Sequence, residues 1–149
     1  GVRLTSKAEY TNIHIQEVAR MPETQLFFYQ EKNGDAPALD WLVKLRGRDT
    51  KAYAACVAKI RLLAAFGHEL RRPTADLLQD DIYELRARRG RVNYRILYFF
   101  HGKDVAVLTC GLTKEKKVPA GDIQRAVIRK KRYEEAPDTH RATRSPEDL

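Results

Sequence analysis

The spacing of apolar residues changes several times along the chain, and each spacing predicts one kind of secondary structure. The run Gln25–Gln30 is short, apolar and aromatic and is followed by Asn33-Gly34, which predicts a strand and a turn. Pro37 then begins a segment with leucines at helical spacing. Proline suits the first position of a helix because its missing N–H has no partner there. This first helix is expected to end at Gly47.

A second helix is predicted directly after the first. Asp49 is suited to cap it, since a side-chain carboxylate accepts hydrogen bonds from the free N–H groups of a first turn. Gly67 marks its end. The apolar residues of this segment fall on one helical face: Tyr53, Val57, Ile60 and Ala64. Because the connection is so short, the two helices predict an antiparallel helical hairpin.

From Asp81 onward the pattern is typical of strands. Asp81–Arg86 and Asn93–Phe100 are rich in β-forming residues and flank a basic turn at Gly90. Another turn precedes Val105–Cys110, so three consecutive strands predict an antiparallel meander. Pro119 begins a last helix. The order strand, helix, helix, three strands, helix predicts an α+β fold with a small antiparallel sheet.

The patterning predicts one domain, from residue 21 to residue 135. Residues 1–20 show no apolar face and precede Met21, the only methionine, so we expect them to form an N-terminal extension. Residues 136–149 are rich in Pro, Asp, Thr, Ser and Arg, which predicts a flexible C-terminal tail.

Composition narrows the classes of protein that we expect. No apolar run reaches the roughly 20 residues of a membrane span, and the first residues lack the apolar stretch of a signal peptide. We therefore expect a soluble, cytoplasmic protein. Cys56 and Cys110 stand far apart, and the four histidines are scattered, so neither residue type has the spacing of a metal site. No metal and no cofactor are expected.

The positive charge is concentrated in one third of the chain. The net charge is +8, and the segment from Tyr83 to Tyr133 holds 14 Lys and Arg against 4 Asp and Glu. The remainder is slightly acidic, with 14 basic against 16 acidic residues. A charge needed only for solubility would be spread more evenly, so this distribution favours a nucleic-acid partner.

Four segments carry a resemblance to known proteins: Pro37–Leu42, Ile82–Arg86, Tyr94–Phe100 and Leu112–Pro119. In this order and at this spacing they resemble the RelE/ParE toxin superfamily, and within it the phage-derived HigB-like branch. The resemblance extends from about Leu26 to Tyr133.

The resemblance implies a small antiparallel sheet with helices on one face. It also implies a toxin of a type II toxin–antitoxin system that an antitoxin holds inactive. Many such toxins cleave mRNA in the ribosomal A site, whereas the ParE branch poisons DNA gyrase. The fold therefore does not decide the function, which has to be inferred from the site residues.

Alternation along the predicted strands brings three charged side chains to one face of the sheet. Glu84 and Arg86 lie two residues apart and share a face. If the hairpin pairs Arg86 with Arg95, both guanidinium groups and the carboxylate converge. Two facing arginines repel each other, which favours an anion between them. The alternative is that Glu84 neutralises one arginine in a surface ion pair of about 0–1 kcal/mol.

Such a pair of arginines suits RNA cleavage without a metal ion. The ribose 2′-hydroxyl is a nucleophile already placed beside the phosphate, so the protein has to remove its proton and stabilise the negative charge that develops. A guanidinium group matches phosphate oxygens with two parallel hydrogen bonds and stays charged. Arg86 and Arg95 are therefore the candidate catalytic cations.

The resemblance adds Lys114 as a catalytic residue, at the edge of the RNA groove. Members of the superfamily often have a tyrosine early in the next helix, but Val118–Asp122 contains no aromatic residue. Glu84 and Glu69 are the two candidates for the general base. Further basic residues are expected to contact the nucleic acid: Arg88, Arg89, Arg91, Lys116 and Lys117.

The sequence as a whole predicts a metal-independent endoribonuclease toxin that cleaves mRNA, on the ribosome. The expected partners are mRNA, the ribosome and a helix-turn-helix antitoxin of the HigA type. Two alternatives stay open. One is a non-catalytic, ParE-like inhibitor of gyrase, and the other is a phage-derived RNA-binding module without activity.

Overall fold

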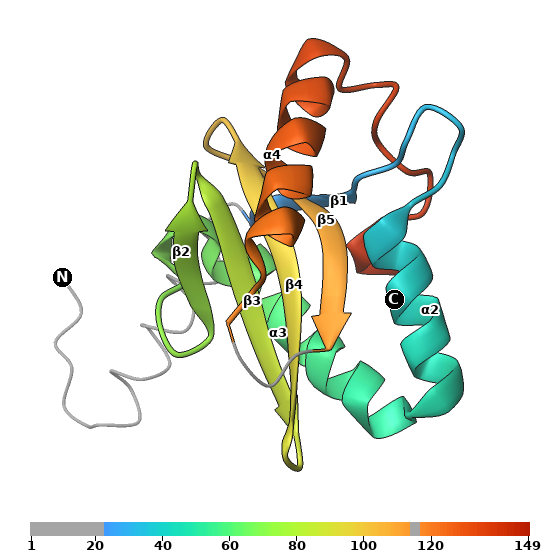
Figure 1. Ribbon diagram of the computed structural model, residues 1–149, viewed down its shortest axis with the longest axis vertical. Helices are drawn as coiled ribbons and strands as arrows, with labels where there is room; N and C mark the ends of the chain where they lie inside the picture. Colours follow the sequence, from blue (N-terminus) through green and yellow to red (C-terminus); the bar gives the residue numbers. More distant parts are fainter. Residues whose placement is uncertain (1–22, 114–116) are drawn as a thin grey trace, which may run out of the picture.

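The computed structural model describes residues 23–113 and 117–149 (Figure 1). The predicted N-terminal extension, residues 1–20, lies outside this part of the chain. The described residues form a five-stranded sheet, three α-helices and two short 3-10 helices. None of the helices in the described part is long and apolar enough to cross a membrane.

The sheet has the strand order β1-β5-β4-β3-β2. Its strands are β1 (Gln25–Phe28), β2 (Ala75–Gln79), β3 (Ile82–Arg89), β4 (Val92–His101) and β5 (Val105–Thr113). The last four form antiparallel neighbours, as the predicted meander requires. The α+β class is confirmed, and the predicted strands and helices occur in the predicted order, with β2 as an additional strand before the three predicted ones.

Two features of the sheet differ from the prediction. β1 pairs with β5 in parallel, so the sheet is mixed rather than wholly antiparallel. β2 was not predicted, because it is short and carries Asp76 and exposed Leu77 in place of a continuous apolar face. It turns into β3 through Asp80 and Asp81, both with positive φ, which aspartate tolerates better than most residues.

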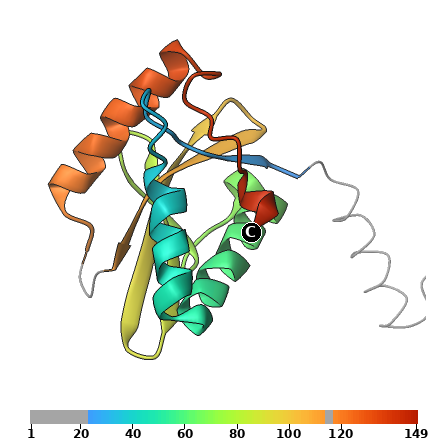
Figure 2. The same ribbon diagram turned by 90° about the vertical axis from the view of Figure 1, so that its right-hand side faces the viewer.

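Helices cover both faces of the sheet, which corrects the expectation of one covered face (Figure 2). α2 (Pro37–Arg48) and α3 (Thr50–Phe66) form the predicted hairpin on one face. Asp49 caps α3 as predicted, accepting from the backbone N–H groups of Lys51 and Ala52. α4 (Ala120–Glu135) packs on the other face.

The two faces have separate cores. The α2–α3 core includes Leu42, Ile60 and Tyr98, all nearly inaccessible to solvent. The α4 core includes Phe99 and Tyr133. Because strand side chains alternate, the face of each remaining residue of β3 and β4 follows from these core residues.

The C-terminal segment is packed, which contradicts the prediction of a flexible tail. The backbone N–H of Ala142 donates to the carbonyl oxygen of Phe28 at 2.9 Å, and Arg141 forms an isolated antiparallel bridge with Tyr29, next to the end of β1. His140 stacks on Tyr29 with ring centroids 5.2 Å apart, and the Arg141 guanidinium lies 4.2 Å from the centre of the Phe27 ring. The composition misled because backbone pairing and ring stacking hold this segment, together with a few apolar side chains, Ala142, Pro146 and Leu149.

Candidate functional site

The candidate site lies on the face of the sheet that α4 covers only in part. Near α4 this face is apolar, with Ile82 and Phe99 in the core beneath the helix. Toward the β3–β4 turn the same face carries Glu84 and Arg86 on β3 and Arg95 on β4. Figure 1 shows these strands extending well beyond the start of α4 toward their turn.

The register brings the two predicted arginines together. Arg86 lies directly opposite Arg95, as predicted from the hairpin. Arg86 Nε donates to Glu84 Oε1 at 2.6 Å, and Arg95 Nη1 donates to Glu84 Oε2 at 2.9 Å. The Glu84 side chain is only 1% exposed, so this is a buried bridge between two cations rather than a surface ion pair.

Asp76 on β2 joins this cluster from the next strand. It accepts from Arg86 Nη2 at 3.3 Å and from Arg72 Nε at 3.0 Å. The hydrogen bond from Arg72 lowers the pKa of Asp76, with smaller contributions from the charges of Arg72 and Arg86. Sequence reasoning missed Asp76 because β2 was not predicted. A carboxylate facing a pair of arginines across a strand would be the signal once that strand is known.

The two arginines differ in side-chain exposure and in the number of their hydrogen-bond partners. The Arg86 side chain is 38% exposed and already has two carboxylate partners. The Arg95 side chain is 15% exposed and is bonded to Glu84 alone. Its Nε is buried without a hydrogen-bond partner among the described residues. Arg86 therefore faces solvent, while Arg95, opposite it on β4, has a buried Nε donor without a hydrogen-bond partner among the described residues.

The remaining predicted residues are distributed around this cluster. Arg88, Arg89 and Arg91 are exposed at the β3–β4 turn, where Arg88 Nε donates to the Gly90 carbonyl oxygen at 2.9 Å. Lys117 is exposed just before α4. Lys114 and Lys116 lie outside the described residues.

Glu69 is not brought to the arginines. It belongs to the 3-10 helix η1 (Gly67–Glu69), where the neighbouring His68 stacks on Phe100 with centroids 3.6 Å apart. Phe100 packs against the α2–α3 core, on the opposite face of the sheet from Glu84. The structure therefore separates the two candidates for a general base.

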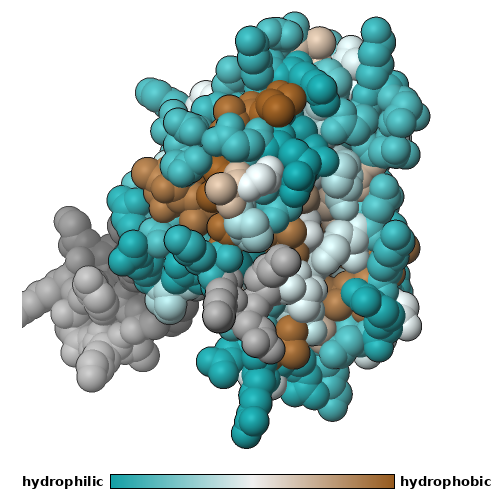
Figure 3. All heavy atoms as spheres, viewed as in Figure 1, coloured by the Kyte–Doolittle hydropathy of each residue, from teal (hydrophilic) through white to brown (hydrophobic). Residues whose placement is uncertain are grey.

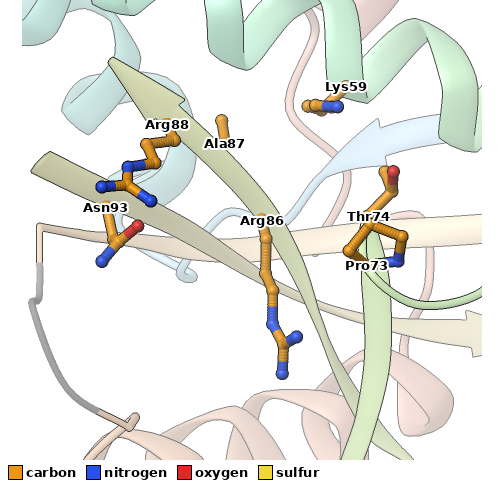
Figure 4. Close-up of a pocket in the computed structure, with 7 residues that line it drawn as sticks. All are labelled: Lys59, Pro73, Thr74, Arg86, Ala87, Arg88 and Asn93. Carbon is orange, nitrogen blue, oxygen red and sulfur yellow. The ribbon is translucent and has the colours of Figure 1, made fainter. Parts of the chain in front are cut away.

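A cavity of about 290 Å³ opens at the edge of β3, beside the arginine cluster (Figure 4). Seven residues line it: Lys59, Pro73, Thr74, Arg86, Ala87, Arg88 and Asn93. Lys59 comes from α3, and sequence reasoning did not single it out. A second cavity of about 340 Å³ lies between β2 and the start of α4, with Leu78 and Ile123 in its lining. Figure 3 shows apolar side chains gathered in this region of the surface.

Within residues 23–113 and 117–149, no group of three or more His, Cys, Asp or Glu side chains is placed to hold a metal ion.

Residues 41–131 match the family described as phage derived protein Gp49-like (DUF891). No curated protein matches the chain. The matched segment contains the arginine cluster and every residue that lines the cavity at the β3 edge.

Proposed function

The chain belongs to the family of phage-derived Gp49-like proteins, a family related to the RelE superfamily of toxin–antitoxin toxins, and from this membership we propose that it is an RNA-cleaving toxin. Its proposed activity is metal-independent endonucleolytic cleavage of mRNA on the ribosome, as in the HigB-like branch. The family suggests an antitoxin partner. We propose that this partner is a helix-turn-helix protein that covers the basic surface.

One observation carries the proposal: two arginines are held side by side by a buried carboxylate on an accessible part of the sheet. Facing guanidinium groups repel each other, so the pair is unfavourable unless a counter-charge is present. Glu84 supplies one negative charge between two positive ones. Asp76 accepts from Arg86 and from Arg72, so the cluster of three arginines and two carboxylates keeps a net formal charge of +1, which suits a phosphate that becomes more negative in the transition state.

The chemistry needs three tasks from the protein. The 2′-hydroxyl loses a proton, the phosphorane charge is stabilised, and the 5′-oxygen gains a proton as it leaves. Arg86 would bind a phosphate oxygen from the solvent side, and the partly exposed guanidinium group of Arg95 would bind another.

Glu84 fits a positioning role better than that of a general base. A general base has to reach the proton that it removes. Both Glu84 oxygens accept from guanidinium groups, and the side chain is buried. We therefore assign Glu84 to orienting Arg86 and Arg95. Lys114, which follows β5 in the sequence, stays our proposed residue for proton transfer.

The experiment that tests this function is induction of the chain in cells, with mapping of transcript 5′ ends before and after. New 5′ ends inside coding regions, together with growth arrest that the antitoxin relieves, are expected. Growth arrest with intact transcripts and damaged DNA would contradict cleavage and identify a gyrase inhibitor. RNA binding without either effect would identify an inactive RNA-binding module.

A further inference from the structure

The edge of β3 is uncovered where the cavity lies. β2 begins at Ala75, which pairs with Leu85, whereas β3 continues to Arg89. The last residues of β3 therefore have β4 on one side and no strand on the other. The cavity of about 290 Å³ occupies this position, bounded by Pro73 and Thr74 on the approach to β2 (Figure 4).

The lining of this cavity is basic. Lys59 approaches from α3 on one side of the sheet, and Arg86, Arg88 and Asn93 extend toward the other side (Figure 4). None of the lining residues is acidic. Neither Lys59 nor Arg88 forms an ion pair within the described part of the chain.

The backbone of β3 adds polar groups at the same edge. The backbone N–H of Arg86 donates to the Thr74 carbonyl oxygen at 2.7 Å, so it points away from β4. Backbone groups two residues apart in an antiparallel strand point the same way. The N–H and carbonyl of Arg88 are therefore directed to the open edge, next to the Asn93 amide.

We propose that this cavity is a second phosphate subsite, which holds a nucleotide next to the scissile bond of a single-stranded RNA. The proposal rests on the proposed function and names the path of its substrate. Arg86 contributes to both the arginine cluster and the cavity, since it donates to Glu84 and also lines the cavity. A strand whose scissile phosphate lies at Arg86 and Arg95 brings its neighbouring phosphate to Lys59 and Arg88.

The lining favours RNA over an acidic peptide. Only two of the seven lining residues are apolar, Pro73 and Ala87, so the cavity offers few apolar side chains to a peptide. The hydroxyl of Thr74 and the amide of Asn93 both donate and accept hydrogen bonds, as recognition of ribose and base edges requires. Lys59 supplies a compact charge that suits a phosphate without demanding one orientation.

The test is binding of 2′-O-methyl RNA, which cannot be cleaved, to the intact chain. A dinucleotide, with one phosphate, and a hexanucleotide are compared across salt concentrations by fluorescence anisotropy. Lys59→Ala should weaken binding of the hexanucleotide about fivefold, the upper range for one accessible ion pair. The slope of log affinity against log salt should fall in magnitude by about 0.7, the value for one phosphate contact on a single strand.

The matched control is Lys51→Ala, which removes the same charge from the same helix away from the cavity. We expect Lys51→Ala to change neither the affinity for the hexanucleotide nor the slope of log affinity against log salt. Lys59→Arg should retain the wild-type slope. The dinucleotide should lose little affinity in any variant, since it fills only the arginine cluster. Melting temperatures within about 2 °C of the wild type establish that the variants are folded.

Several outcomes would overturn the subsite. One is equal loss in the Lys59 and Lys51 variants, and another is equal loss for the dinucleotide and the hexanucleotide. A glutamate-rich peptide that binds better than the hexanucleotide and depends on Lys59 would identify a protein partner instead. If wild-type chain cleaves RNA but Lys59→Ala binds normally, the subsite fails and the proposed function stands. If Lys59→Ala lowers the slope of log affinity against log salt as expected but the wild-type chain cleaves no RNA, the subsite stands and the proposed cleavage fails.

Discussion

Arg86 and Arg95 lie directly opposite each other on β3 and β4, and the buried carboxylate of Glu84 accepts a hydrogen bond from each. Removing Glu84 leaves two facing cations without the carboxylate between them, whereas removing either arginine leaves one cation paired with Glu84. The consequences for folding and for cleavage differ from residue to residue, which makes the cluster open to separate tests.

Glu84→Gln should destabilise the fold. The amide keeps the size of the side chain but leaves two facing guanidinium groups without a counter-charge. Breaking a fully buried pair costs about 3–5 kcal/mol, and since Arg86 is partly exposed we expect about 2–4 kcal/mol. Urea denaturation measures the loss. The control is Glu134→Gln, whose carboxylate is exposed and lies 3.9 Å from Lys130. A loss below about 0.5 kcal/mol would show that Glu84 is not needed as a counter-charge.

Arg95→Ala should lower cleavage by a factor of about 100 or more, the loss typical of one transition-state donor. It should also lower stability by about 1–2 kcal/mol, because Glu84 loses one of its two partners. Arg95→Lys should restore part of the stability and little of the cleavage, since an ammonium group cannot form two parallel hydrogen bonds. Cleavage rate and unfolding free energy are measured on the same preparations. A stable and fully active Arg95→Ala would remove the residue from the mechanism.

Asp76→Asn should flatten the dependence of stability on pH at acid pH. The pKa of Asp76 is lowered in the folded chain, chiefly by the hydrogen bond from Arg72. Its stabilising contribution is therefore present above the unfolded-state pKa of about 3.9 and is lost as pH falls through the lower folded pKa. Melting temperatures between pH 2 and pH 6 should fall less steeply for Asp76→Asn than for the wild type. Asp138→Asn, at an exposed position, should keep the wild-type curve.

Deletion of residues 136–149 should destabilise the fold, contrary to what the sequence alone leads one to expect. The segment pairs with β1, and it buries His140 and Pro146. Loss of this burial is expected to cost about 2–4 kcal/mol and to lower the melting temperature by about 10 °C. Arg141→Ala, which removes the contacts with Phe27 and Tyr133, should produce part of this loss. Arg144→Ala, at an exposed position, is the control. An unchanged melting temperature of the deletion variant would contradict the packing.

The elements that could be predicted are those with strong local signals. Asp49 and the apolar spacing around it define α3, and the turn at Gly90, with its positive φ, fixes the register that pairs Arg86 with Arg95. β2 could not be predicted, because its polar and exposed residues give no alternation. The parallel pairing of β1 with β5 depends on contacts between distant segments, which no local pattern encodes.

The same distinction applies to the candidate site. Glu84, Arg86 and Arg95 were found because strand alternation and one turn place all three. Asp76 required knowledge of β2, and Lys59 required knowledge of how α3 crosses the sheet. The apolar spacing of a helix says which of its faces is buried. It does not say which of its polar residues reaches the edge of the strand beneath.

The pairing of the C-terminal segment with β1 has a consequence for self-association. The backbone N–H of Ala142 donates to the Phe28 carbonyl oxygen, and that of Gln30 donates to the His140 carbonyl oxygen, so the C-terminal segment pairs with the chain where β1 ends. An exposed sheet edge is a template for pairing with another chain. A molecule with one open edge stops at a dimer when it pairs in this way, whereas a molecule with two open edges adds copies without limit. In the described sheet the C-terminal segment obstructs pairing at the end of β1, so we expect edge-to-edge association to involve β2 and to stop at a dimer.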